Sequence, residues 1–237
     1  MALLYARSWP VWKPDDTEQN EMIMAYLGLL HAGIPVDIVS DAEVADGRFA
    51  ARNYKALYVV NESVPASAQQ AILQWVRDGG RLWAAGWAGM RDEYHSPTPL
   101  WDEMLGTKAR AWTATGDLTR KGEQIRPDDW KRPIFGRTTT GFTALHRAYG
   151  KGRIEIVPFG AGKQYLDAAS ELQGALAKAI IYPAAMRGIY ADFALAAGAR
   201  PPAVTSVDQV LAWPLWSKQG GVVLLANFTG NPADQVT

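Results

Sequence analysis

The chain has 237 residues, 48% of them hydrophobic, and its 24 basic and 24 acidic side chains give a formal net charge of zero. This length can bury a full core, while the balanced charge and the lack of an apolar run of roughly 20 residues argue against nucleic-acid and membrane partners. Cysteine is absent, which excludes disulfides and thiolate metal sites, and we expect no bound metal or cofactor.

The first 90 residues alternate between apolar runs and segments with helical periodicity. Strands are predicted at residues 2–7, 34–39, 54–60 and 81–85, with helices from the cap at 15–17 to Gly33 and from Pro65 to Gly79-Gly80. Short connections favour a parallel sheet with right-handed crossovers and covering helices. The expected fold class is α/β: a flavodoxin-like, doubly wound, mostly parallel sheet.

The first apolar run has neither a basic leader nor a small-residue cleavage site. We therefore expect a strand and not a signal peptide at this position. A cytoplasmic location follows as our expectation, although a domain cut from a secreted parent would have the same composition.

The pattern loosens after Gly89. A short helix is predicted at residues 100–106, followed by a polar stretch at 107–141, a hairpin of strands 142–149 and 153–159, an alanine-rich helical segment at 166–198 interrupted by Pro183, and antiparallel strands at 204–207, 210–216 and 222–228. We expect an α/β domain over residues 1–200 and the beginning of a small β domain over 201–237.

The fourth predicted strand ends at a turn with glycine on both sides, Gly86-Trp87-Ala88-Gly89. In α/β hydrolases, a turn of this kind is a strained strand-to-helix elbow that exposes the catalytic nucleophile. Here the central position is Ala88, preceded by Trp87, and the chain has no cysteine. The sequence therefore predicts the frame of an active site without its nucleophile.

Aromatic and charged residues follow the carboxyl ends of three predicted strands, where this fold class binds ligands. The predicted ligand-binding set is Trp9, Trp12, Glu62, Trp87, Arg91 and Asp92. Indole rings stack on sugars while charged groups bond to hydroxyls, which favours a carbohydrate-facing rim. Trp and Arg are also enriched in protein interfaces, so an oligomer interface and ordinary loop packing are alternatives. An oligomer that lines a cleft would combine the first two interpretations.

The same rim carries the residue types of a nucleophile–base–acid triad: Ser8 or Ser63, His95, and Glu62 or Asp92. Neither serine occupies the elbow and no oxyanion-hole loop is recognisable, so we assign no catalytic residue and keep these five as weak candidates. Glu62 with Asp92 would suit glycoside hydrolysis at the appropriate spacing.

Two further histidines lie outside the rim. His31 ends the first predicted helix, where a cation suits the helix dipole, and capping is its expected role. His146 alternates within a predicted strand and is expected to be an ordinary surface histidine.

Several motifs follow one another in the order of a known domain. They are residues 54–60, Gly79-Gly80-Arg81-Leu82 through Gly89, Arg91-Asp92-Glu93, Pro99-Leu100 to Leu105-Gly106, and residues 149–153, 156–159 and 221–229. In this order they resemble the trimerisation domain of bacterial β-galactosidases, a class I glutamine-amidotransferase-like domain, with the start of the small β domain that follows it. The resemblance covers nearly the whole chain.

The resemblance implies a role as well as a fold. In those galactosidases the catalytic carboxylates lie on a separate (β/α)8 barrel, and the amidotransferase-like domain builds the trimer and walls the cleft. For this chain it implies a non-catalytic domain of a β-galactosidase-type glycoside hydrolase, forming a homo-oligomer (a dimer or a trimer) near a carbohydrate site. The alternatives are a stand-alone hydrolase acting on a glycoside or ester through the rim residues, and a carbohydrate-binding module.

Overall fold

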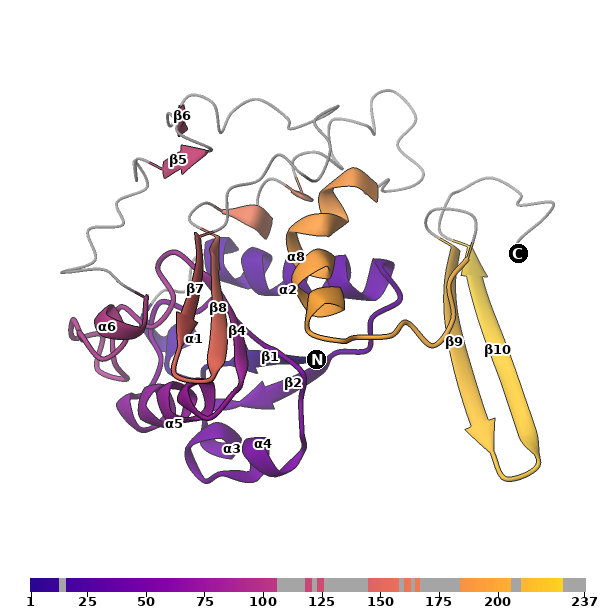
Figure 1. Ribbon diagram of the computed structural model, residues 1–237, viewed down its shortest axis with the longest axis horizontal. Coiled ribbons are helices and arrows are strands. Elements are labelled where there is room, and N and C mark those ends of the chain that lie inside the picture. The colour runs from indigo at the N-terminus through magenta and orange to yellow at the C-terminus, as the bar shows by residue number, and fades with distance from the viewer. Residues whose placement is uncertain are drawn as a thin grey trace.

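The computed structural model describes residues 1–12, 16–105, 118–120, 123–125, 145–157, 160–162, 165–166, 184–205 and 210–227. At its centre lies a six-stranded sheet in the order β2-β1-β3-β4-β8-β7 (Figure 1). Its strands are β1 Ala2–Tyr5, β2 Asp37–Ser40, β3 Leu57–Val59, β4 Arg81–Ala85, β7 Leu145–Tyr149 and β8 Gly152–Val157. Five of them run parallel, and β7 pairs antiparallel with β8 at the edge. The predicted α/β fold with a mostly parallel sheet is confirmed.

The central strands are buried on both faces, which explains their nearly continuous apolar sequence. Their register places Tyr58, Trp83 and Glu155 side by side across β3, β4 and β8. Because side chains alternate between the two faces of a strand, these three residues point to the same side of the sheet.

That side is covered by α8 (Ala184–Ala196), with α2 (Asp16–His31) packed beside it (Figure 1). The Tyr58 hydroxyl donates to the Tyr190 carbonyl at 2.7 Å, and Trp83 Nε1 donates to the Ile189 carbonyl at 3.1 Å. These two bonds fix α8 above the middle of the sheet and satisfy polar atoms that burial would otherwise leave unpaired.

The opposite side carries α5 (Ala66–Arg77), which packs against β8 and against α3 (Asp41–Ala45). A capping box begins α3: the Ser40 hydroxyl accepts from the Glu43 amide, and the Glu43 carboxylate accepts from the Ser40 amide. The sequence patterns had not predicted α3 or the neighbouring α4 (Arg48–Ala51), because each is too short for helical periodicity to be visible.

The remaining described elements lie at the periphery. They are α1 (Trp9–Trp12), α6 (Asp102–Leu105), the short antiparallel pair β5 (Leu118–Arg120) and β6 (Glu123–Ile125), and a hairpin of β9 (Val210–Ser217) with β10 (Gly220–Asn227). The β9–β10 hairpin extends beside the α/β body and is joined to it by the segment that follows α8 (Figure 1).

Some predicted boundaries were wrong. The strand expected at 34–39 begins only at Asp37, and residues 204–205 are not in the strand expected there. The alanine-rich segment is helical where described from Ala184, directly after Pro183, as expected if the proline starts a new helix. Residues 167–183, and most of the polar stretch at 107–141, lie outside the described residues. The boundary between the two expected domains stays a prediction.

Candidate functional site

The structure gathers the predicted rim residues beyond the ends of β1, β3 and β4. The two loops after β3 and β4 continue side by side: the Gly89 amide donates to the Asn61 carbonyl at 2.9 Å, and the Arg91 amide donates to the Glu62 carbonyl at 3.1 Å. A parallel bridge between Ser63 and Arg91 extends the pairing further. The rim is therefore an extension of the sheet and not a set of independent loops.

The turn after β4 is closed by packing. Ala88 is fully buried, and Gly89 adopts a φ of +62° with the Trp101 ring directly against it. No helix follows the strand directly, because residues 86–89 form turns and α6 begins only at Asp102. The prediction of a strand that ends at this turn is confirmed, but the prediction that a helix follows the turn directly is wrong.

Trp87, the aromatic residue of this turn, is half-buried against the core. Its indole Nε1 donates to the Val60 carbonyl at 2.7 Å, so the ring is held between the ends of β3 and β4. The two other predicted tryptophans differ sharply in exposure: Trp9 is 5% exposed and Trp12 is 44% exposed. Of the predicted stacking surfaces, the Trp12 ring is the one that solvent reaches most readily.

Glu62 and Arg91 form an ion pair of 2.9 Å in which Glu62 is 12% exposed. The Arg91 guanidinium also donates to the His95 carbonyl at 2.9 Å. Asp92 has a local role, since its Oδ1 accepts from the amides of Tyr94 and Ser96. These two carboxylates, considered earlier as a glycosidase pair, each hold a segment of the 91–96 loop.

Two members of the predicted triad do meet. Ser63 Oγ lies 2.9 Å from His95 Nδ1, and the His95 ring stacks on Trp12 with centroids 5.9 Å apart. Ser8 donates to the Ser63 carbonyl at 3.2 Å and so supports this segment. The third member of a triad is not in place, because Glu62 and Asp92 have the partners just described. Ser63 is only 2% exposed, which restricts access to its hydroxyl.

His31 contradicts its predicted role as a cationic cap. Burial, together with the nearby Arg187 guanidinium, lowers its pKa from 6.5 to about 4. The imidazole is therefore neutral at pH 7, and its Nδ1 lies 2.9 Å from the Tyr165 hydroxyl. Sequence position alone suggested a helix terminus in water, but the terminus is covered by another part of the chain.

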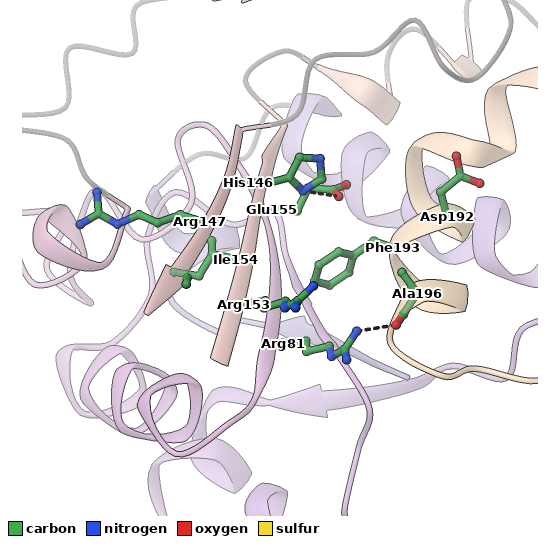
Figure 2. A pocket seen from close by; sticks show the side chains of 10 residues that line it. Arg81, His146, Arg147, Arg153, Ile154, Glu155, Asp192, Phe193 and Ala196 are labelled. Carbon is green, nitrogen blue, oxygen red and sulfur yellow. Dashed lines mark hydrogen bonds and ion pairs between the residues drawn. The ribbon is translucent and has the colours of Figure 1, made fainter. Parts of the chain in front are cut away.

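A second candidate site, which the sequence patterns did not suggest, lies between the sheet and α8. This pocket of about 550 Å³ has a floor of β4, β7 and β8 and a wall of α8 (Figure 2). The side chains that give it its chemistry are Arg81, His146, Arg153, Glu155, Asp192 and Phe193. One signal was available in the sequence: Arg153 and Glu155 alternate with buried isoleucines in a strand next to the sheet's centre.

The carboxyl groups of this pocket are in an unfavourable electrostatic setting. Burial, and then the Asp192 charge, raise the pKa of Glu155 from 4.5 to about 7. Burial also raises the pKa of Asp192. His146, expected to be an ordinary surface residue, is 71% exposed and its Nδ1 lies 3.4 Å from the Glu155 carboxylate.

The described residues contain no group of three or more acidic or histidine side chains that could hold a metal ion. Within the same residues, no helix has both the length and the apolar character required to cross a membrane.

Comparison with solved structures finds β-galactosidases that contain a similar architecture. A catalytic mutant of Gan42B, a GH42 β-galactosidase from G. stearothermophilus, matches 96% of this chain with a TM-score of 0.62 and 15% sequence identity. The fold is similar to part of a β-galactosidase. The β-galactosidases from Bacillus circulans sp. alkalophilus and Rahnella sp. R3 both match with a TM-score of 0.60, at 13% and 14% identity over 95% and 96% of this chain.

The chain spans only 34–35% of the length of these galactosidases. No protein-family model matches the sequence, and no curated protein matches it. At these identities the similarity establishes a common fold, and function has to be argued from the sites.

Proposed function

We propose that this chain is a non-catalytic, amidotransferase-like domain related to β-galactosidase-type glycoside hydrolases, which builds a homo-oligomer and helps to wall a carbohydrate cleft. The observation that carries the proposal is the match of 96% of the chain to about one third of a GH42 β-galactosidase. A domain that corresponds to a fraction of an enzyme is suited to supporting a site that other parts of the enzyme complete.

The finer fold assignment is part of this proposal. Among the five parallel strands the order is β2-β1-β3-β4-β8, which is the 2-1-3-4-5 order of flavodoxin-like sheets. That order supports the amidotransferase-like class, with β7 as an added antiparallel edge. It also puts the rim at the carboxyl ends of the strands, where such folds bind ligands.

The state of the rim supports a non-catalytic role. Ala88 at the turn has no nucleophilic atom and is fully buried. The strongest acid–base candidates, Glu62 and Asp92, hold the loop through an ion pair and through two backbone bonds. A catalytic carboxylate has to face its substrate, whereas these two are engaged within their own loop.

Hydrolysis assays on the purified chain test the proposal. We expect no turnover of a chromogenic β-galactoside by the wild type, and no difference between it and the Glu62→Gln and Asp92→Asn variants. Robust turnover that either substitution abolishes would refute the non-catalytic role. Ser67→Ala, a change at an exposed position on α5, serves as the control for effects of purification.

One observation favours a second candidate, a stand-alone hydrolase: the 2.9 Å contact between Ser63 Oγ and His95 Nδ1. A fluorophosphonate probe discriminates the two functions, because it labels a serine that a base activates. Labelling of Ser63 that His95→Gln abolishes would favour the hydrolase. Absence of labelling on a folded protein is what the non-catalytic proposal predicts.

A further inference from the structure

The pocket beneath α8 separates its charges along β8. Arg153 and Glu155 are two residues apart on the same face of this strand, about 6.6 Å along its axis. Arg81 on β4 is the register partner of Arg153, and Asp192 lies on the α8 wall near Glu155. One end of the pocket is therefore basic and the other acidic.

The basic end has a free guanidinium. Arg81 donates to the Ala196 carbonyl near the end of α8 (Figure 2). Arg153 lines the same pocket, and among the described residues no hydrogen bond or ion pair engages its side chain. Two like charges on paired strands repel each other, and a carboxylate bound between them would relieve that repulsion through charge-assisted bonds.

Among the described residues that line the pocket, no arginine or lysine lies at its acidic end. The Glu155 side chain is 12% exposed and shares this end with Asp192, while its partner His146 is largely in solvent. Burial disfavours the charged form of both carboxylates, and the Asp192 charge adds to this effect at Glu155, whose pKa is raised. A bound ammonium group would pair with the carboxylate oxygens of both Glu155 and Asp192, because it can donate three hydrogen bonds.

An apolar surface connects the two ends. Phe193 points from α8 toward the sheet between the acidic and basic groups, and Ala196 lies next to it on the wall (Figure 2). A volume of about 550 Å³ is within the range of small-molecule sites, roughly 300–1,000 Å³.

We propose that this pocket binds a small zwitterion, an α-amino acid with an apolar side chain. Its ammonium group lies between Glu155 and Asp192, its carboxylate on Arg153, and its side chain against Phe193. A neutral sugar would bring no opposite charge to the largely buried Glu155 carboxylate or to the more exposed Asp192 and Arg153, so it would gain none of these charge-assisted bonds. The proposal is independent of the oligomerising role.

Calorimetric titration of the full chain with four compounds tests the assignment. L-leucine carries both charges, L-leucinamide lacks the carboxylate, N-acetyl-L-leucine lacks the ammonium, and D-galactose is neutral. We expect leucine to bind, and each derivative and galactose to bind about tenfold or more weakly, because each loses at least one charge-assisted interaction. No binding of leucine, equal binding of a derivative, or tighter binding of galactose would overturn the proposal.

Variants locate the site. Arg153→Gln should weaken leucine binding by about tenfold and leave leucinamide unchanged, whereas Glu155→Gln should weaken leucine and leave N-acetyl-leucine unchanged. Arg147→Gln is the matched control, since the Arg147 side chain points away from the charged floor (Figure 2). Thermal unfolding of each variant verifies that it is folded. Equal loss in the control and in Arg153→Gln would overturn the assignment.

Discussion

Glu155 stands on β8 between two buried isoleucines, close to Asp192 and beside the exposed His146. Its pKa rises from 4.5 to about 7 because burial, and secondarily Asp192, disfavour the charged form. Between pH 4.5 and 7 the folded protein consequently binds more protons than the unfolded chain. The free energy of unfolding therefore falls as the pH rises through this window.

Replacing Glu155 by glutamine should flatten that dependence. The full pKa shift of Glu155 corresponds to a loss of about 3 kcal/mol in the free energy of unfolding at pH 8. Glutamine avoids this loss while it keeps the size and the hydrogen-bonding oxygen of the side chain. Urea unfolding of both proteins from pH 5 to 8 measures the effect. The exposed Glu103→Gln variant is the control, and parallel stability curves for wild type and Glu155→Gln would contradict the prediction.

His31 acts in the opposite direction. Its pKa is lowered from 6.5 to about 4, so the folded protein holds a neutral imidazole where the unfolded chain is protonated. Stability should decline as the pH falls from 6.5 toward 4, by less than the full shift because part of the ring is solvated. His31→Gln should reduce this decline in urea unfolding at pH 6.5 and 4.5. If His31→Gln lost as much stability between pH 6.5 and 4.5 as the wild type, other groups would be responsible for the decline.

At the scale of elements, the contact between α2 and α8 depends on one small residue. A Cβ built on Gly28 would overlap the ring of Tyr190, which is fully buried and also contacts the rings of Trp83 and Tyr165. Alanine in place of glycine gains about 1 kcal/mol of helix propensity, but overpacking costs about 1–3 kcal/mol. The steric effect should exceed the gain in propensity because the Tyr190 ring is fully buried against Trp83 and Tyr165.

Gly28→Ala is therefore expected to lower the free energy of unfolding by up to about 2 kcal/mol, measured by urea unfolding at pH 7. The double variant Gly28→Ala with Tyr190→Leu provides the test of cause, because a smaller side chain should accommodate the new methyl group. If the two changes were additive, the overlap would not explain the loss.

The elements themselves were largely predictable from sequence. Residues 82–85 are apolar on both faces of their strand, and α5 has both a periodic apolar face and glycine at its end, so local signals agree with the fold. The rim residues were predictable as a group, because parallel strands bring their carboxyl ends together. The contacts that these residues make were not predictable. The ion pair of Glu62 with Arg91 and the burial of Trp9 both depend on tertiary packing.

The pocket beneath α8 was missed for a similar reason. It joins β4, β7, β8 and α8, whose residues are separated by up to 115 positions, as the bond from Arg81 to Ala196 illustrates. The charged residues in the otherwise apolar strand β8 indicated that one of its faces is not packed entirely within the hydrophobic core. No local pattern could reveal which charges meet there.

At the scale of the whole molecule, the β9–β10 hairpin forms a separate two-stranded sheet whose apolar side chains are largely exposed. Large apolar side chains are exposed along it: Leu215, Trp216, Val222, Val223, Leu224 and Leu225. Neighbouring residues of β10 face opposite sides, so both faces of the ribbon are apolar and exposed. A two-stranded ribbon is marginally stable alone, and exposed apolar patches of this kind mark interaction sites. Within the proposed oligomer, a second copy of the chain would cover this hairpin.

Sedimentation analysis of Leu224→Glu tests that placement. A charge buried in an apolar interface is costly, so the variant should dissociate at concentrations where the wild type is a dimer or trimer. Leu195→Glu, at an exposed leucine on α8, is the matched control and should sediment as the wild type does. Trp12→Ala separates the alternatives: dissociation by this change, with Leu224→Glu still assembled, would move the interface to the rim. A wild type that is monomeric at all concentrations would refute the proposed oligomer.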